Sequence, residues 1–259
     1  MSFQNLIINS TDVQRSIDFY TKFLEAEVVA EPTPGGALLD LVTGALEIRD
    51  GAAGDSTWVP DDLQLGFRHV GFKVDRVDPR AELLKSADIP FHLDPLDAEG
   101  GVRICFFFDP DGTLLEFVEG DLQYASTVDP EGVAAERALG VPPRPRLDHV
   151  AVTVHDRTAT AEFYRPLGFS FIGTIEQPND PRGFSIGYLK SGDTVLEVFT
   201  YEAEKRGRKP QFDGPGFGYA RLTGPPPSEA FPIASVTGEQ VFADPNGFLF
   251  SALADGSAA

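Results

Sequence analysis

The feature that most constrains the fold of this chain is an internal repeat. Residues 3–20, FQNLIINSTDVQRSIDFY, align without a gap with residues 147–164, LDHVAVTVHDRTATAEFY. Asp12 then falls on Asp156, and a Phe-Tyr pair closes both segments. Each segment reads as a strand, a polar turn with a capping aspartate, and a helix with apolar residues at helical spacing. The repeat predicts two copies of one structural plan.

A weaker repeat divides each copy again. The segment from Phe67 reads as a strand followed by a helix, and DPDG at 109–112 matches DPNG at 244–247. Four β-α-β-β-β units are therefore expected, starting near residues 3, 66, 147 and 217. The fourth is degenerate, because three consecutive prolines at 225–227 occupy the place of its helix.

These units predict an α+β fold made of two tandem modules. The first module covers residues 1–122 and the second covers 147–259, with a degenerate second half. Residues 123–146 form a linker, which holds the short helical segment PEGVAAERAL and then the stiff, extended VPPRPR.

Composition narrows the function classes. The 40 Asp and Glu residues outnumber the 21 Lys and Arg residues, which argues against a protein that grips a nucleic-acid backbone. Cys105 is the single cysteine and has no internal disulfide partner, which is typical of a reducing compartment. No signal peptide or apolar span is evident. We expect a cytoplasmic monomer or homodimer that binds a small molecule, with neither nucleic acid nor a membrane as partner.

Two glutamates occupy strand positions where apolar side chains belong. Glu116 shares its face with Leu114 and Val118, and Glu197 is flanked in the same way by apolar residues. A buried carboxylate needs a cation, a hydrogen-bond network or a metal. Few same-face arginines exist here, so a divalent cation is a candidate. The alternative is that these strands lie at a sheet edge and the glutamates reach solvent.

The repeat, the LGF at 167–169 and the closing DPDGTLLEF at 109–117 resemble the vicinal oxygen chelate superfamily. That superfamily includes glyoxalase I, extradiol ring-cleaving dioxygenases, and the bleomycin- and fosfomycin-resistance proteins. The resemblance covers nearly the whole chain. It implies curved mixed sheets that enclose a cleft for a metal and a substrate.

The resemblance also implies metal-ligand positions on the first and last strands of each unit. Transferred to this chain they are Asn5 and Glu47, His69 and Glu116, His149 and Glu197, and Tyr219 and Ser251. If units pair across modules, as in domain-swapped glyoxalase-like dimers, units two and three assemble the complete set His69, Glu116, His149 and Glu197. If units pair consecutively, as in ring-cleaving dioxygenases, Asn5 and Glu47 join His69 and Glu116 instead. We favour the crossed pairing.

Imidazole and carboxylate ligands together suit Zn, Ni, Co, Mn or Fe(II). We expect a metal-dependent isomerase or lyase of the glyoxalase type, which chelates a small substrate through adjacent oxygens and transfers a proton through an enediolate-type intermediate. Glu116 or Glu197 is the expected base, and the sequence does not choose between them.

Two other functions stay open. One is an Fe(II) extradiol dioxygenase, although only His92 and His155 remain as further histidines. The other is a metal-free drug-binding or resistance protein whose groove would be lined by Phe106, Phe107 and Phe108. Strand alternation, however, predicts that most of these three residues belong to the core. Trp58 lies in a loop, as a lid or as an anchor.

Overall fold

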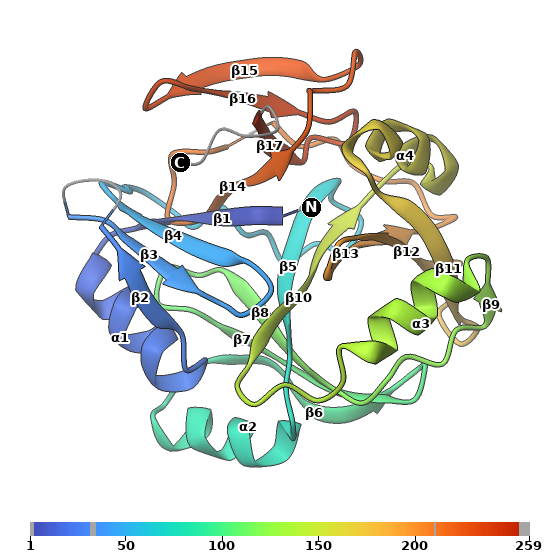
Figure 1. The fold of residues 1–259 in the computed structure, drawn as a ribbon, viewed down its shortest axis with the longest axis horizontal. Coiled ribbons are helices and arrows are strands. Elements are labelled where there is room, and N and C mark those ends of the chain that lie inside the picture. The colour runs from blue at the N-terminus through green and yellow to red at the C-terminus, as the bar shows by residue number, and fades with distance from the viewer. Residues whose placement is uncertain (1–2, 32–34, 210, 254–259) are drawn as a thin grey trace.

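Two mixed sheets form the framework of the computed structural model, which describes residues 3–31, 35–209 and 211–253 (Figure 1). The elements of unit one are β1 (Phe3–Ser10), α1 (Val13–Phe23), β2 (Glu27–Ala30), β3 (Ala37–Asp40) and β4 (Ala45–Asp50). Unit two contains β5 (Gly66–Lys73), α2 (Val77–Ser86), β6 (Phe91–Ala98), β7 (Val102–Phe108) and β8 (Leu114–Glu119).

The second half of the chain repeats this order. Unit three contains β10 (Arg146–Thr153), α4 (Arg157–Tyr164), the short helix η1 (Arg165–Leu167), β11 (Ser170–Gln177), β12 (Phe184–Ser191) and β13 (Thr194–Thr200). Unit four contains β14 (Gly216–Thr223), β15 (Phe231–Val236), β16 (Glu239–Ala243) and β17 (Leu249–Leu253). The polyproline segment at 225–227 forms no helix, as expected.

The helix starts confirm the repeat. The side chain of Asp12 accepts a hydrogen bond from the backbone N–H of Arg15 at the start of α1. Asp156 does the same for Ala159 at the start of α4. Because an N-cap aspartate satisfies backbone donors that have no partner within the helix, both turns fix where their helix begins.

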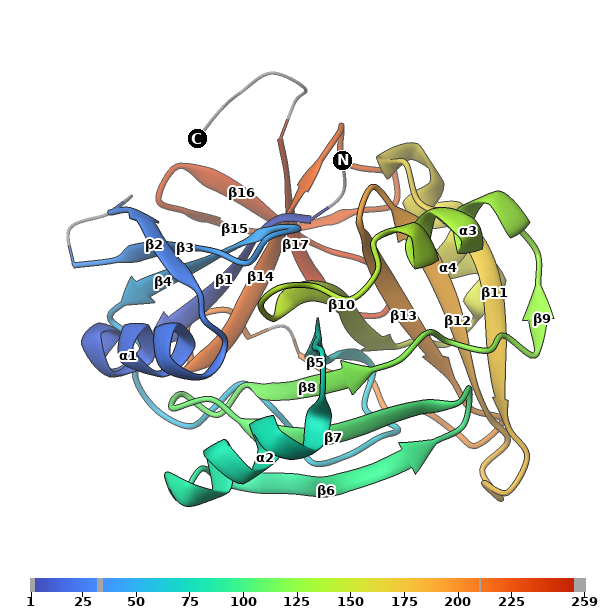
Figure 2. The same ribbon diagram turned by 60° about the horizontal axis from the view of Figure 1, so that its bottom comes forward.

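The units pair across the two modules. Strand β1 lies antiparallel to β14, so units one and four share the sheet with the order β15-β16-β17-β14-β1-β4-β3-β2. Strand β5 lies antiparallel to β10, so units two and three share the sheet β6-β7-β8-β5-β10-β13-β12-β11-β9. The crossed pairing is confirmed, and consecutive pairing is wrong. Figure 2 shows the two arms of the larger sheet spreading from β5 and β10.

The segment between the modules packs against the larger sheet. Strand β9 (Ser126–Thr127) pairs with β11, and α3 (Pro130–Ala138) forms where the sequence predicted a short helix. Val133 of this helix is buried in a cluster with Ile172 and Ile175. No helix in the described part of the chain is long and apolar enough to span a membrane.

The main hydrophobic core joins all four units. It includes Leu6, Val70, Val150 and Phe250, one from the first or last strand of each unit. Val150 and Val152 of β10 enter this core, as does Val154 just after the strand. The opposite face of the central strands is therefore free to carry polar side chains into a cleft.

Candidate metal site

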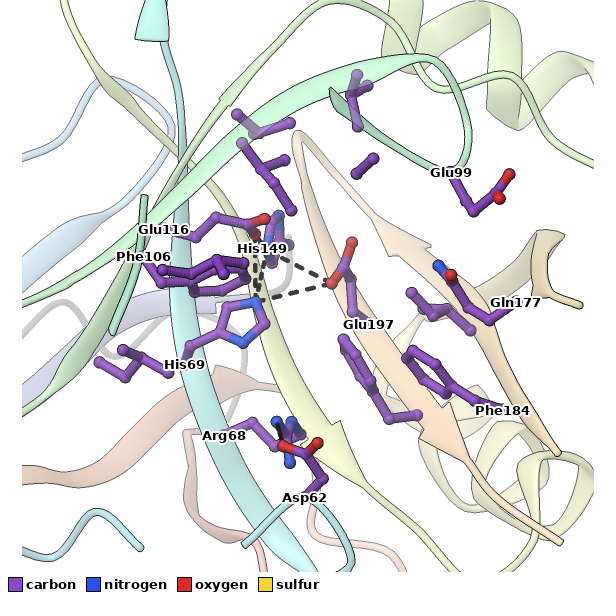
Figure 3. A pocket seen from close by; sticks show the side chains of 18 of the residues that line it. Asp62, Arg68, His69, Glu99, Phe106, Glu116, His149, Gln177, Phe184 and Glu197 are labelled. Atoms are coloured by element: carbon purple, nitrogen blue, oxygen red, sulfur yellow. Dashed lines mark hydrogen bonds and ion pairs between the residues drawn. The ribbon is translucent and has the colours of Figure 1, made fainter. Parts of the chain in front are cut away.

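Four neighbouring strands bring two histidines and two glutamates together. His69 lies on β5 and His149 on β10, and these two strands are paired. Glu116 comes from β8, which pairs with β5, and Glu197 comes from β13, which pairs with β10. Both glutamate strands are paired on each side, so the edge-strand interpretation of these residues is wrong. The structure thus assembles the complete set that crossed pairing predicts (Figure 3).

The four side chains converge on one point. One ligand atom from each residue lies within 4.8 Å of all the others. Glu116 Oε2 lies 2.8 Å from His149 Nε2 and 3.3 Å from His69 Nε2. Glu197 Oε2 is farther away, 3.5 Å from His149 Nε2 and 3.8 Å from His69 Nε2. Within the described ranges, this is the one group of His, Cys, Asp and Glu side chains with such spacing.

Burial makes the charges of this group depend on one another. Burial alone would raise the pKa of Glu116, but hydrogen bonds from His149 and His69 outweigh it and lower the pKa to about 2. Burial raises the pKa of Glu197 to about 7, and the charge of Glu116 adds to this effect. Burial also lowers the pKa of His69 to about 4. The two carboxylates therefore have different environments, with Glu116 the more strongly ionised.

His149 is oriented by its surroundings. Asp148 Oδ2 lies 3.2 Å from His149 Nδ1, and Asp148 also accepts a hydrogen bond from Arg146. These partners, against the effect of burial, lower the pKa of Asp148. A carboxylate on the far ring nitrogen is the usual partner of a metal-binding histidine, because it leaves Nε2 unprotonated and pointed at the ion. The directions of Nε2 on both histidines fit this arrangement.

The group opens into a cavity of about 290 Å³. Leu114, Glu116 and Val118 all line it, which confirms the predicted shared face on β8. Most of the remaining wall is apolar or aromatic and includes Phe106, Phe184, Ile186 and Phe199. The charged lining residues include Arg68, Lys73 and Arg182. A mainly apolar cavity with a few convergent polar groups is typical of a small-molecule site.

The donor set fits a divalent cation. Two imidazole nitrogens and two carboxylates are hard-to-borderline ligands of the kind that Zn, Ni, Co, Mn and Fe(II) accept. Without a cation, His149 compensates part of this charge: burial opposes its protonation, but the charges of Glu197 and Glu116, 3.5 and 2.8 Å from its Nε2, raise its pKa. An ion held by His69, Glu116, His149 and Glu197 would compensate both charges.

The other transferred positions form an ion-pair network instead. Glu47 accepts hydrogen bonds from Arg49 and from Arg221, at 2.6 and 2.9 Å. Arg221 also makes two 2.8 Å bonds to Glu239. Asn5 lies beside the Arg221 guanidinium, while Tyr219 and Ser251 donate to Glu239. In units one and four, arginine side chains therefore occupy the place that corresponds to the two-His, two-Glu group of units two and three.

Sequence reasoning missed the arginines of this network and one tyrosine at the metal cluster. Arg221 shares its strand face with Tyr219, and Arg49 with Glu47, so alternation alone would have found both. Tyr188 is buried and lines the cavity, and burial together with the charge of Glu197 raises the pKa of its hydroxyl. Tyr188 lies on β12 opposite Glu197, and only the register of the paired strands shows this, so the sequence alone did not indicate it.

The aromatic residues left open by the sequence have separate places. Phe106 and His92 line the cavity, whereas Phe107 is fully buried in the core. The indole N–H of Trp58 donates to the carbonyl of Arg68, and its ring contacts His92 and Phe108 edge-on. Trp58 is therefore an anchor of its loop.

Comparison with known proteins agrees with this architecture. The family model described as the Glyoxalase/Bleomycin resistance protein/Dioxygenase superfamily matches residues 2–117 and 146–253. Glyoxalase I from Zea mays superposes with a TM-score of 0.65 at 21% identity, covering 96% of this chain and 91% of that one. A Bacillus subtilis protein provisionally named a dioxygenase gives 0.62 at 15% identity, covering 100% and 86%. No curated protein matches the sequence significantly.

Proposed function

Because the chain belongs to the glyoxalase, bleomycin resistance protein and dioxygenase superfamily, we propose that it is a divalent-metal-dependent enzyme. It acts on a small substrate that chelates the ion through two adjacent oxygens. The observation that carries this proposal is the convergence of His69, Glu116, His149 and Glu197 at the wall of an apolar cavity. An ion at this position supplies Lewis-acid stabilisation of negative charge on the chelating oxygens.

The two glutamates have different roles in this proposal. Glu116 is the fixed ligand, since it lies closest to both histidines and is the more strongly ionised. Glu197 is the base, since it lies farther from both histidines, and burial together with the charge of Glu116 holds its pKa above that of Glu116. It takes a proton from the substrate carbon next to the chelating oxygens and returns it to the neighbouring carbon or oxygen.

Tyr188 positions this base. It lies opposite Glu197 on the paired strands β12 and β13, and its ring packs edge-on against Tyr124 at 5.1 Å between centroids. With an ion bound, Tyr188 would keep the Glu197 carboxylate on the cavity side, where it can take a proton from the substrate. The apolar wall excludes water, so the proton is kept between Glu197 and the substrate.

Metal analysis of the purified protein tests the proposal. We expect about one equivalent of a divalent transition metal per chain, and a loss of most of it in His149→Ala and in Glu116→Gln. The control is His155→Ala, because His155 is an exposed histidine outside the cavity. Absence of bound metal, or equal loss in the control, contradicts the proposal.

A ring-cleaving Fe(II) dioxygenase is the second candidate. The observation in its favour is that Tyr188 and His92 both line the cavity, where they supply the acid–base groups that such chemistry needs. Anaerobic reconstitution with Fe(II) followed by a catechol oxygen-uptake assay tests it. Uptake above that of the Glu116→Gln variant supports the dioxygenase, and its absence excludes catechol as substrate.

A further inference from the structure

A β-bulge directs Arg68 along the cavity wall. On the paired strands β5 and β10, His69 lies opposite Ala151 but Phe67 lies opposite Val152, so Arg68 is an extra residue without a partner. An extra residue bends its strand and re-aims the side chain, a device common beside active sites. Arg68 therefore lines the same cavity as His69, its neighbour in the chain (Figure 3).

The second bulge of this strand pair has a different outcome. On β10 the extra residue is Asp148, between Leu147 and His149. Its carboxylate is already engaged by His149 and Arg146. The two bulges thus place an anion, Asp148, and a cation, Arg68, beside the metal cluster. Asp148 already has its partners, whereas Arg68 has a hydrogen-bond donor without a partner.

The Arg68 guanidinium has more donors than partners. Nη2 donates to Asp62 at 2.6 Å, Nη1 reaches Thr153 Oγ1 only at 3.5 Å, and Nε is buried with no partner. The guanidinium lies over the Phe199 ring at 5.2 Å, which holds its plane at the wall of the cavity. A planar guanidinium with unused donors is the preferred partner of a carboxylate.

The other cations of the cavity are already committed. Arg182 makes three hydrogen bonds to Asp180 and a fourth to Asp62, and its side chain is 39% exposed against 15% for Arg68. The ammonium of Lys73 donates to the carbonyl of Gly120. Of the two arginines that line the cavity, Arg68 is therefore the less exposed and the one with a donor that has no partner.

We propose that the substrate is a compact carboxylate with an apolar or aromatic body, and that Arg68 binds its carboxylate. This inference rests on the proposed function, because the same molecule presents its adjacent oxygens to the metal. The body packs against Phe106, Phe184 and Phe199, which line the wall. The volume of about 290 Å³ lies at the small end of ligand pockets and suits a molecule of one ring and a short side chain.

Calorimetric binding of phenylacetate and of its neutral isostere phenylacetamide tests this inference. Both are titrated into metal-loaded and into chelator-treated protein, so that binding of the carboxylate to the metal is separated from binding to Arg68. We expect phenylacetate to bind at least about tenfold more tightly than the amide in both forms. Absence of phenylacetate binding, or equal binding of the two probes, overturns the inference.

Variants locate the effect. Arg68→Gln should weaken phenylacetate binding about tenfold or more and leave the amide unchanged, whereas Arg68→Lys should keep part of the preference. Arg103→Gln removes the same charge from a residue outside the cavity and should have no effect. An unaltered metal content in Arg68→Gln shows that the cavity is intact, and an equal loss in Arg103→Gln refutes the assignment.

The two proposals fail separately. Protein that holds no metal but prefers phenylacetate through Arg68 refutes the metal-dependent function and supports the anion site. Protein that binds metal through His149 and shows no preference for the carboxylate supports the function and refutes the substrate class.

Discussion

Gly71 lies directly opposite His149 on the paired strands β5 and β10, and the imidazole ring occupies the space beside its Cα. A Cβ atom at position 71 would lie 2.0 Å from His149 Cε1 and 2.1 Å from Nε2. No real Cβ makes such contacts, so the ring position depends on the absence of a side chain at this residue. The facing histidine, His69, lies opposite Ala151.

Gly71→Ala should therefore displace His149 from the cluster. We expect an affinity for divalent metal at least about tenfold lower, together with a loss of about 1–3 kcal/mol in the free energy of unfolding from overpacking. Metal titration and urea denaturation measure the two effects. Gly207→Ala is the matched control, because a Cβ at Gly207 meets no atom within 4 Å. Unchanged metal affinity in Gly71→Ala would show that the ring has room elsewhere.

Asp148→Asn tests the orientation of the same ring from its other side. Asparagine keeps the shape of the side chain but removes the charge that lies beside His149 Nδ1. We expect metal affinity to fall about 10- to 100-fold, as is usual when the outer partner of a metal-binding histidine is lost. Metal competition with a chromophoric chelator gives the value. Asp193→Asn, at an exposed turn, should leave the affinity unchanged.

The repeat made most of the fold predictable from the sequence. Strand alternation correctly placed Glu116 and Glu197 on the inward face, since side-chain direction follows from period two alone. Crossed pairing of the units was a choice between two topologies, because the packing energies that decide it come from residues far apart in the chain. The bulges at Arg68 and Asp148 lay beyond prediction, because a one-residue register shift leaves no mark in a single sequence.

The arginine network shows a second limit of sequence reasoning. The transferred positions Asn5, Glu47, Tyr219 and Ser251 hold one carboxylate and no histidine, which is a poor ligand set. What replaces the ion depends on Arg221 from unit four reaching Glu47 of unit one. That contact exists only because β1 and β14 pair, so it could not be predicted before the topology was known.

This network predicts a specific acid sensitivity. Burial alone would raise the pKa of Glu239. Hydrogen bonds from Arg221 and Ser251 outweigh burial and lower this pKa to about 2, below its value in the unfolded chain. Its stabilisation is therefore complete above the unfolded pKa of about 4.3 and is lost as pH falls toward 2. Urea midpoints of the wild type should drop between pH 5 and pH 3, and Glu239→Gln should drop less. An identical pH profile in both proteins would contradict this account.

Tyr20 and Tyr164 hold the two sheets together in matching ways. The Tyr20 hydroxyl donates to Asp109 at 2.7 Å, and the Tyr164 hydroxyl donates to Asp244 at 3.0 Å. Each bond joins the first helix of a module to the Asp-Pro turn of its second unit. Tyr20→Phe and Tyr164→Phe should each lower the free energy of unfolding by about 1–3 kcal/mol, because a buried acceptor loses its donor. Thermal or urea unfolding measures both, and a loss in only one would show that the repeat is not energetically symmetric.

The Asp-Pro turn at Asp109 should make the free energy of unfolding depend on pH in the opposite direction to Glu239. Burial raises the pKa of Asp109 to about 6, above its unfolded value. The folded state therefore holds this proton more tightly, and the stability it contributes is lost as pH rises through 6. Asp109→Asn should remove this dependence between about pH 4 and the folded pKa of about 6, whereas Asp121→Asn, which changes an exposed carboxylate, should retain it.

The unequal distances of Glu116 and Glu197 from the histidines predict a separation between binding and chemistry. Glu116→Gln should lose most of the metal, because this carboxylate makes the shortest contacts, 2.8 and 3.3 Å, to His149 and His69. Glu197→Gln should keep most of the metal but lose at least about a hundredfold in proton transfer, since an amide is no base. Exchange of the carbon-bound protons of 2-hydroxyacetophenone into D₂O, followed by NMR, measures the second effect. Equal loss of metal in both variants, or exchange that persists in Glu197→Gln, would show that the two carboxylates do not divide the roles in this way.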